Sequence, residues 1–368
     1  MPAFNHYIPI LRWKAAEREA LQNLTPEQKA SITPLIEIIM PRPKTYKKGS
    51  REKTPEELLA ESIDSLRSAL PKIPTNILKA WGSASAILEV GLVHVDLRAE
   101  ALREILALGE KVGVHLVPAI GLNSDPKTVQ VAVALAKKYG HGMCIRLFRS
   151  DLAEKALLPN RIKQFLGSCG IAQTDIDLIL DYQITDQSDS QYQDLPDVCE
   201  HIPELPQWRT FTVASGAFPP DLVNFDVNLH KIPRYDWMNW IAQVKSGNLR
   251  RKPYFADYTI QHPLFKEPVR GANPSASIRY TIPEEWMIMR GRGLRSPKSN
   301  GHAQYPALAQ LLLIQKEFCK GSFSFGDEYV ETVGASLKTK KTGNPRTWLR
   351  AGINHHLAMV VSQLSNLS

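Results

Sequence analysis

The stretch ITPLIEIIMPRPKTYKKGSREK, residues 32–53, joins an apolar run to a strongly basic segment. Its first part, ITPLIEII, is rich in Ile and Leu, as expected of a buried β-strand, and it carries Glu37 near its end. The second part, residues 41–53, holds six basic residues and a single acid, Glu52. The fold has to explain why a buried strand directs a carboxylate toward a basic loop.

Similar apolar runs recur along the chain, and most of the segments between them are amphipathic helix candidates. Strands that alternate with helices predict a parallel sheet, and eight such units predict a (β/α)₈ barrel of the TIM type. A large doubly wound sheet gives a similar pattern, and IPRYDW at 232 fits either a ninth strand or the start of a helix. The eight runs are HYIPIL near 6, ITPLIEII at 32, LVHVDL at 92, VHLVPAI at 114, MCIRLF at 143, DLILDY at 177, RTFTVA at 209 and YFADYT at 254.

The alternation stops near residue 271. SIRYTIPEEWMIMRGRG reads as two extended segments around a Pro-Glu-Glu turn, and further helices follow it. A chain of 368 residues is long enough for one domain of about 250 residues and an appendage. We therefore predict a barrel over residues 1–265 and a C-terminal α+β appendage, packed on the barrel, over residues 266–368.

The composition is that of an ordinary soluble protein, with 43% hydrophobic and 22% charged residues. A net charge of +8 favours anionic partners without naming one. No signal peptide or membrane-spanning run is readable, so we expect a cytoplasmic protein without a membrane partner. Four scattered cysteines lack metal-ligand spacing and indicate reduced thiols. They are Cys144, Cys169, Cys199 and Cys319.

Charged residues recur near the carboxyl ends of the predicted strands. Side chains alternate between the two faces of a strand, so VHVDLR, MCIRLF and DLILDY each direct charged side chains to the polar, inward face. Barrel enzymes build their sites at the carboxyl ends of the strands, and we expect these charges to converge on one mouth. The catalytic candidates are Glu37, Asp96, Asp181 and Asp257, and Arg98 and Arg146 are candidates for ligand binding.

Inward charges are costly unless they are paired, hydrated or bound to a ligand. They could form internal Arg–carboxylate pairs that plug the barrel, but their number favours a functional pocket. The basic loop with Lys44, Lys47 and Lys48 would then lie above the mouth and attract an anion. A solvated loop explains these lysines equally well.

Several other signals are weaker. Clustered carboxylates could hold Mg²⁺ while arginines brace a phosphoryl group, but the sequence does not establish that geometry. RGRGLRSPK, with Arg290 and Arg292, has the character of a phosphate-contacting loop and equally of an ordinary surface loop. His355 and His356 are neighbours on a helix and point about 100° apart, so one of them is expected to be a packed or capping residue. No GxSxG, P-loop, HExxH or GxGxxG-helix signature is present.

The order of short motifs resembles the Beta protein family, which is named for a phage-satellite product encoded in the gop-beta-cll type of defence locus. The similarity covers residues 7 to 361 and implies a bacterial or prophage protein associated with antiphage defence, without a settled reaction. Lys14 and Arg279 lie in matching motifs and join the ligand-binding candidates. Asp236 stands where Glu is expected and Ala256 where Gly is usual; neither change removes a charge. The motifs are YIPILRWK, ITPLIEI, LDY, RYDWMNW, FADYTIQHP, ASIRYT, MRGRG, FSFGDEYV, GNPRTW and GINHHL.

Two functions remain open at this stage. The chain could be a hydrolase that acts at the barrel mouth on a phosphodiester or nucleotide. It could instead be a non-catalytic defence component that binds a phage molecule or a partner protein from a defence operon. The first function needs a preorganised acid–base or metal set in the mouth, whereas the second tolerates a mouth plugged by salt bridges and binding on the appendage.

Overall fold

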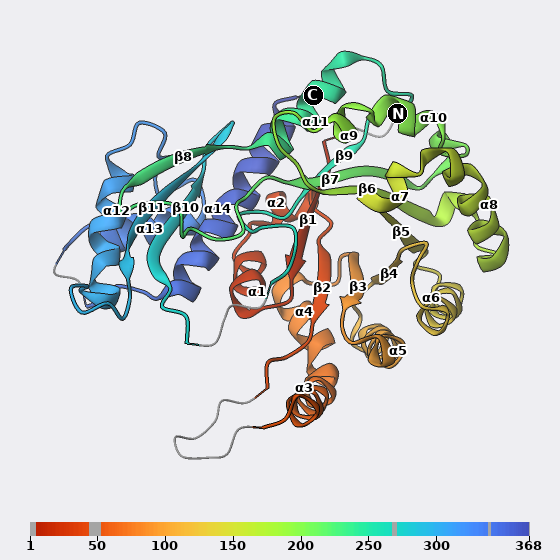
Figure 1. The fold of residues 1–368 in the computed structure, drawn as a ribbon, viewed down its shortest axis with the longest axis horizontal. Helices are drawn as coiled ribbons and strands as arrows, with labels where there is room; N and C mark the ends of the chain where they lie inside the picture. The colour runs from red at the N-terminus through yellow and green to blue at the C-terminus, as the bar shows by residue number, and fades with distance from the viewer. Residues whose placement is uncertain (1–4, 44–52, 267–270, 338–339, 368) are drawn as a thin grey trace.

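Eight parallel strands close into a barrel, and a second sheet of three antiparallel strands lies beside it (Figure 1). The computed structural model describes residues 5–43, 53–266, 271–337 and 340–367. The strand order is β1-β2-β3-β4-β5-β6-β7-β9, and β9 closes the barrel by pairing with β1. The predicted (β/α)₈ barrel is confirmed. Within the described ranges, no helix is long and apolar enough to cross a membrane.

The strands and helices of the barrel follow each other along the chain, and Figure 1 shows the helices around the outside. The strands are β1 Tyr7–Arg12, β2 Leu35–Ile39, β3 Ala86–Leu92, β4 Leu116–Ile120, β5 Met143–Phe148, β6 Ile176–Ile184, β7 Thr210–Gly216 and β9 Tyr254–Asp257. The helices are α1 Ala15–Gln22, α2 Pro26–Ala30, α3 Pro55–Ala69, α4 Ile73–Trp81, α5 Val95–Val112, α6 Pro126–Tyr139, α7 Arg149–Ala153, α8 Leu158–Cys169, α9 Ser190–Gln193, α10 Leu195–Glu200 and α11 Tyr235–Ser246.

The third strand is not the one predicted. The run LVHVDL at 92 was expected to be a strand, but β3 ends at Leu92 and α5 begins at Val95. Leu97, Ala101 and Ile105 recur at helical spacing and are buried on one side of α5. The apparent alternation in VHVDLR is therefore the turn between β3 and α5 and the first turn of that helix.

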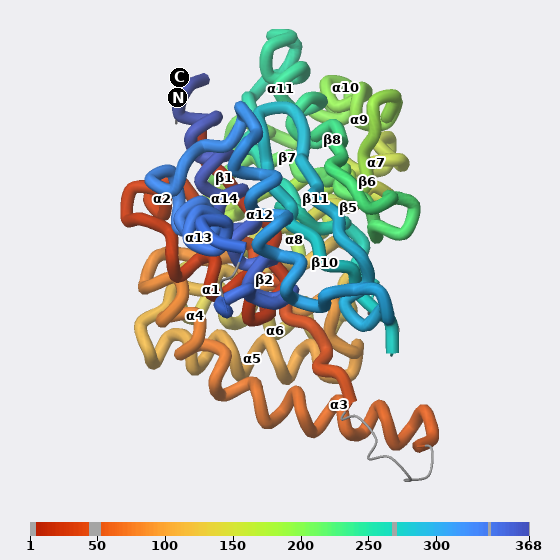
Figure 2. The backbone as a smooth tube through the Cα atoms, turned by 90° about the vertical axis from the view of Figure 1, so that its left-hand side faces the viewer, coloured from red at the N-terminus to blue at the C-terminus, as the bar shows by residue number. Residues whose placement is uncertain are grey.

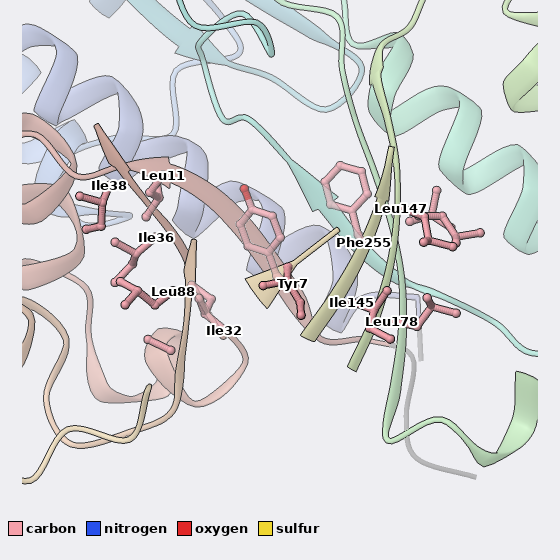
Figure 3. Close-up of a cluster of buried hydrophobic side chains, with 14 of the residues drawn as sticks. Tyr7, Leu11, Ile32, Ile36, Ile38, Leu88, Ile145, Leu147, Leu178 and Phe255 are labelled. Carbon is pink, nitrogen blue, oxygen red and sulfur yellow. The ribbon is translucent and has the colours of Figure 1, made fainter. Parts of the chain in front are cut away.

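Most outward side chains of the barrel strands are apolar, and the inward side chains fill the barrel. The outward side chains pack under the helices, and Figure 3 shows Tyr7, Leu11, Ile145 and Phe255 in this layer. The inward side chains form a separate cluster that fills the barrel below its mouth. That cluster contains Ile8, Ile10, Leu35, Ile87, Val117, Ala119, Cys144, Ile179, Ala214, Ala256 and Tyr258.

The second sheet takes its strands from two parts of the chain. Its order is β10-β11-β8, and β8 precedes β9 of the barrel in sequence. IPRYDW therefore contains both structures that were considered, because β8 ends at Pro233 and α11 begins at Tyr235. A domain boundary at residues 265–266 stays a prediction. The elements are β8 Leu229–Pro233, β10 Ser275–Thr281, β11 Glu285–Gly293, α12 Tyr305–Leu313, α13 Phe325–Gly334 and α14 Pro345–Ser365.

The two faces of this sheet have different neighbours. Ile278, Met287 and Met289 belong to a second core with residues of α12 and α13. Trp286 and Ile288, which point the other way, join the large cluster of the barrel. Figure 2, which looks onto this side of the molecule, shows α12 and α13 grouped with β10 and β11. The sheet is therefore a layer between the barrel and its own helices.

Helix α14 ties the second sheet to the barrel through a row of buried polar side chains. It contacts α1, α13 and β10. Asn354 is fully buried; its side-chain oxygen accepts from the Gly326 amide at 2.9 Å, and its Nδ2 donates to the Ala20 carbonyl at 3.0 Å. One amide group therefore satisfies the backbone of two other helices, α13 and α1.

We expect Asn354→Ala to lower the free energy of unfolding by roughly 3 kcal/mol, because it leaves a buried N–H and a buried carbonyl unpaired. Asn366→Ala, at the exposed end of the same helix, is the control and should change it by less than about 0.5 kcal/mol. Denaturant unfolding of both variants measures the difference. Equal unfolding midpoints would show that Asn354 does not hold α14 in place.

Candidate functional site at the barrel mouth

An arginine lies at the centre of the barrel mouth and is surrounded by carboxylates. Arg146 on β5 points inward and is 1% exposed. Glu37 comes from β2, Glu89 from β3 and Asp181 from β6, and each lies on the inner face near the carboxyl end of its strand. Because parallel strands end at the same rim of a barrel, these four side chains meet there.

Arg146 donates to all three carboxylates. Its Nη1 is 3.0 Å from Glu37 Oε1 and also donates to Glu89 Oε2. Its Nε and Nη2 are 2.8 Å and 2.6 Å from Asp181 Oδ2. Such charge-assisted hydrogen bonds are the strong class in proteins. The guanidinium is therefore saturated by the protein itself.

Tyr258 and Arg12 extend this network to the rim. The Tyr258 hydroxyl donates to Asp181 Oδ2 at 2.6 Å and accepts from Arg146 Nη2 at 2.8 Å. Burial raises the pKa of Tyr258, so it remains a neutral donor. Arg12 Nε lies 3.7 Å from Glu37 Oε2, and its Nη2 donates to the carbonyls of His262 and Pro263. The network thus includes the backbone that follows β9.

This arrangement does not fit the Mg²⁺ ion considered from the sequence. A divalent ion needs several oxygen ligands directed at one point, and here the guanidinium of Arg146 lies between the carboxylates. Among the described residues, no group of three or more His, Cys, Asp or Glu side chains could hold a metal ion. Ion pairs therefore close the mouth, as in the barrel plugged by internal Arg–carboxylate pairs that the sequence left open.

Glu89 was missed by the sequence analysis. The strand AILEVGL carries it on the inner face, next to Glu37 in register, but the third strand was sought six residues later. Burial raises the pKa of Glu89 to about 7; Arg146 opposes this rise and Glu37 adds to it. The alternation of Ile87, Glu89 and Gly91 against Leu88 and Val90 was the signal that could have identified it.

Asp96, Arg98 and Asp257 do not join the Arg146 network, so the prediction that they converge with it on one site is wrong. Asp96 and Arg98 belong to α5; the Asp96 side chain is 84% exposed, and Arg98 donates to the carbonyls of Val93 and Gly91. Asp257 ends β9 as expected, but Ala256 faces the interior and Asp257 therefore faces outward. Neighbouring residues of a strand point to opposite faces, so a difference of one position decides whether Asp257 faces the interior.

Asp257 instead binds the barrel to α14 and the second sheet. Its Oδ1 accepts from the Tyr7 hydroxyl at 2.5 Å, and its Oδ2 is 2.8 Å from His356 Nε2. The other ring nitrogen of His356 is 2.8 Å from the hydroxyl of Thr281 on β10. All four side chains are fully buried. This Thr–His–Asp order resembles that of hydrolytic triads, but here it lies within a packed interface without access to solvent.

The two neighbouring histidines of α14 face different partners. His355 Nδ1 is 2.8 Å from Asp327 Oδ2, and its Nε2 is 2.7 Å from the Thr281 carbonyl. Burial lowers the pKa of His356 although Asp257 opposes the shift, and His356 in turn contributes to a lowered pKa of Asp257. Both groups therefore act as parts of a structural hydrogen-bond network.

The remaining ligand-binding candidates lie on the second sheet, in the basic loop and directly after β1. Arg279 and Arg290 are on the second sheet, and Arg292 is exposed near the end of β11. The Lys14 ammonium lies 4.5 Å from the ring centre of Phe265. The predicted basic-loop residues Lys44, Lys47 and Lys48 lie outside the described residues.

Glu89→Gln should remove a pH-dependent loss of stability. A carboxyl group whose pKa is about 7 in the folded protein and 4.5 in the unfolded chain favours folding below the lower value, and this contribution is lost as pH rises through 7. Relative to the variant, the wild type should lose about 3 kcal/mol between acidic and mildly alkaline pH. Unfolding titrations at both pH values test this, with Glu284→Gln at an exposed turn as the control. Parallel pH profiles for wild type and Glu89→Gln would contradict it.

Asp257→Asn should lower the free energy of unfolding. It removes the charge that accepts from Tyr7 and pairs with His356, and we expect a loss of roughly 3 kcal/mol near neutral pH. Because the pKa of Asp257 is lowered in the folded protein, the difference from wild type should shrink as pH falls through that lowered value. The matched control is Asp64→Asn on the exposed face of α3. An unchanged melting temperature for Asp257→Asn would refute the structural role.

Two chains from tryptophan synthase complexes of Pyrococcus furiosus match with 12% identity and a TM-score of 0.37; they cover 70% and 69% of this chain and 89% and 86% of their own. A search of curated proteins finds no match. The family model described as Beta protein matches residues 7–362, nearly the whole length. The chain therefore belongs to the Beta protein family.

Proposed function

We propose that this chain is an antiphage-defence protein that binds nucleic acid through its C-terminal part and does not catalyse a reaction at the barrel mouth. One observation carries the proposal. Residues 266–368 contain 14 Lys and Arg against 7 Asp and Glu, so they hold +7 of the net charge of +8. A positive field concentrated on one part of a protein attracts a polyanion.

Exposed cations of this part gather at the end of β11 and in the segment that follows it. Arg292, Arg295 and Lys298 are exposed, and each lacks a carboxylate partner in the described structure. Their segment is held by backbone contacts, because Arg292 donates to the Lys298 carbonyl and Arg295 donates to the carbonyls of Gly271 and Ala272. The segment is therefore a positioned basic surface, and its resemblance to a phosphate-contacting loop supports the same partner.

The closed mouth favours binding over catalysis. Arg146 donates to all three carboxylates, so the described residues of this network offer neither an unpaired carboxylate as a base nor an unpaired guanidinium for a phosphoryl group. The association of the Beta protein family with antiphage defence supports the biological setting. A partner protein from the same operon is compatible with this role.

A hydrolase that acts on a nucleotide or phosphodiester is the second candidate. It is favoured by the pKa of Glu89, which is about 7 and suits a general acid or base near neutral pH. The Glu89 side chain is 11% exposed, so a small substrate would reach it only at its edge. Under this alternative, Glu89→Gln abolishes phage protection in a stably folded protein.

The decisive variant replaces Arg292, Arg295 and Lys298 together with Gln. Counterion release makes affinity fall with salt by about one unit of log–log slope per phosphate contact, so the variant should lose affinity and up to about three units of slope. Fluorescence anisotropy with a single-stranded oligonucleotide over a salt series measures both. The matched control replaces Lys127, Lys137 and Lys163, which are exposed on barrel helices α6 and α8.

Phage protection is measured in cells that carry the same variants. Loss of protection with the basic triple variant, together with protection by Glu89→Gln, supports the binding function. Absence of nucleic-acid binding by the wild type at low salt contradicts it. Equal affinity of the wild type and the basic triple variant shows that the basic surface is not the binding site.

A further inference from the structure

Arg279 is a half-buried cation, and none of the carboxylates that the structure describes pairs with it. Its Nη1 donates to the Ile260 carbonyl at 2.8 Å, and its guanidinium lies 4.7 Å from the ring centre of Phe218. Burial lowers the pKa of Arg279 to about 10, so the group is still charged at neutral pH. Arg146 and Arg12, by contrast, each pair with at least one carboxylate. A charge left without a counter-charge in a partly buried position is costly unless an anion joins it.

The position of Arg279 points to the kind of anion. Phe218 follows β7 and Ile260 follows β9, which are the seventh and eighth strands around the barrel. Arg279 reaches these two loops from the barrel-facing side of β10, the side that also carries Thr281. Barrels of this class frequently bind phosphate beside the loops that follow their last two strands. Here a neighbouring sheet supplies the arginine.

A second arginine lies on the same face of the second sheet. Arg279 pairs in register with Ile288, and Ser277 pairs with Arg290. Arg279 and Arg290 are therefore diagonal neighbours, with Cα atoms about 7–8 Å apart. Arg290 is half-buried, its Nε is buried without a hydrogen-bond partner, and no carboxylate among the described residues pairs with it. Ser277 adds a hydroxyl that can donate to an anion.

We propose that Arg279, Arg290 and Ser277 form a binding site for a terminal phosphate of nucleic acid. This rests on the proposed function and narrows its ligand to a strand with a phosphorylated end. A phosphate monoester carries about −1.5 to −2 charges at neutral pH, which matches two arginines, whereas an internal phosphodiester carries one. A terminal phosphate is joined to its strand by a single ester bond, so the strand has to approach the site from one direction only. This suits a position that is closed on one side by Phe218 and Trp286, whose ring centres lie 5.2 Å apart.

The test uses one single-stranded oligonucleotide in three forms: with a 5′-phosphate, with a 3′-phosphate and with hydroxyls at both ends. The wild type should bind one phosphorylated form about tenfold more tightly than the hydroxyl form. Arg279→Gln should remove this preference while leaving the affinity for the hydroxyl form unchanged, because Arg292, Arg295 and Lys298 still attract the strand. Inorganic phosphate should lower the affinity for the phosphorylated form to that for the hydroxyl form, and it should leave the affinity for the hydroxyl form unchanged.

Three further variants sharpen the result. Arg279→Lys keeps the charge but loses the planar fork, so the preference should fall without disappearing. Arg290→Gln, at a half-exposed position, should reduce the preference and serves as the second test should Arg279→Gln unfold. Lys316→Gln removes an exposed charge elsewhere in the same part of the chain and should leave the preference intact.

The outcomes separate the two proposals. Equal binding of all three oligonucleotides by the wild type overturns the terminal-phosphate site and leaves nucleic-acid binding in place. A preference that survives in both Arg279→Gln and Arg290→Gln also overturns the site. Absence of binding to any of the oligonucleotides overturns the proposed function together with this inference.

Discussion

The pairing of Arg146 with Glu37, Glu89 and Asp181 is the constraint on which the upper half of the barrel depends. Three strands each place a carboxylate inside the barrel, and isolated carboxylates there would be strongly unfavourable. One guanidinium with five donors donates to all three carboxylates from the centre. The apolar cluster below and the loops above can therefore pack tightly around charges that are already neutralised.

The net charge is distributed unevenly along the chain. Residues 1–265 contain 31 Lys and Arg and 30 Asp and Glu, so the part of the chain that builds the barrel strands is nearly neutral. The surplus of positive charge lies after residue 265. Under the proposed function, the nearly neutral part serves as the scaffold, and the exposed Arg292, Arg295 and Lys298 form the recognition surface.

Strand periodicity was enough to predict the barrel and three members of its mouth, Glu37, Arg146 and Asp181. It failed where local patterns have two readings. VHVDLR alternates like a strand, yet Leu97 starts the buried stripe of α5. Asp257 was predicted at a strand end, and only its register with the neighbouring strands shows which face it occupies. The partners of Arg279 could not be predicted, because they depend on how two sheets pack and not on either segment alone.

The interleaved position of β8 has a consequence for how the protein is made. β8 leaves the ribosome before β9, but its pairing partner β11 begins more than fifty residues later. During synthesis the barrel can close while β8 still lacks its neighbour, and the second sheet has to be completed on a barrel that already exists. For the same reason, no single cut of the chain separates the two sheets as intact units. Transplanting either one to another protein would require grafting two segments or a circular permutation.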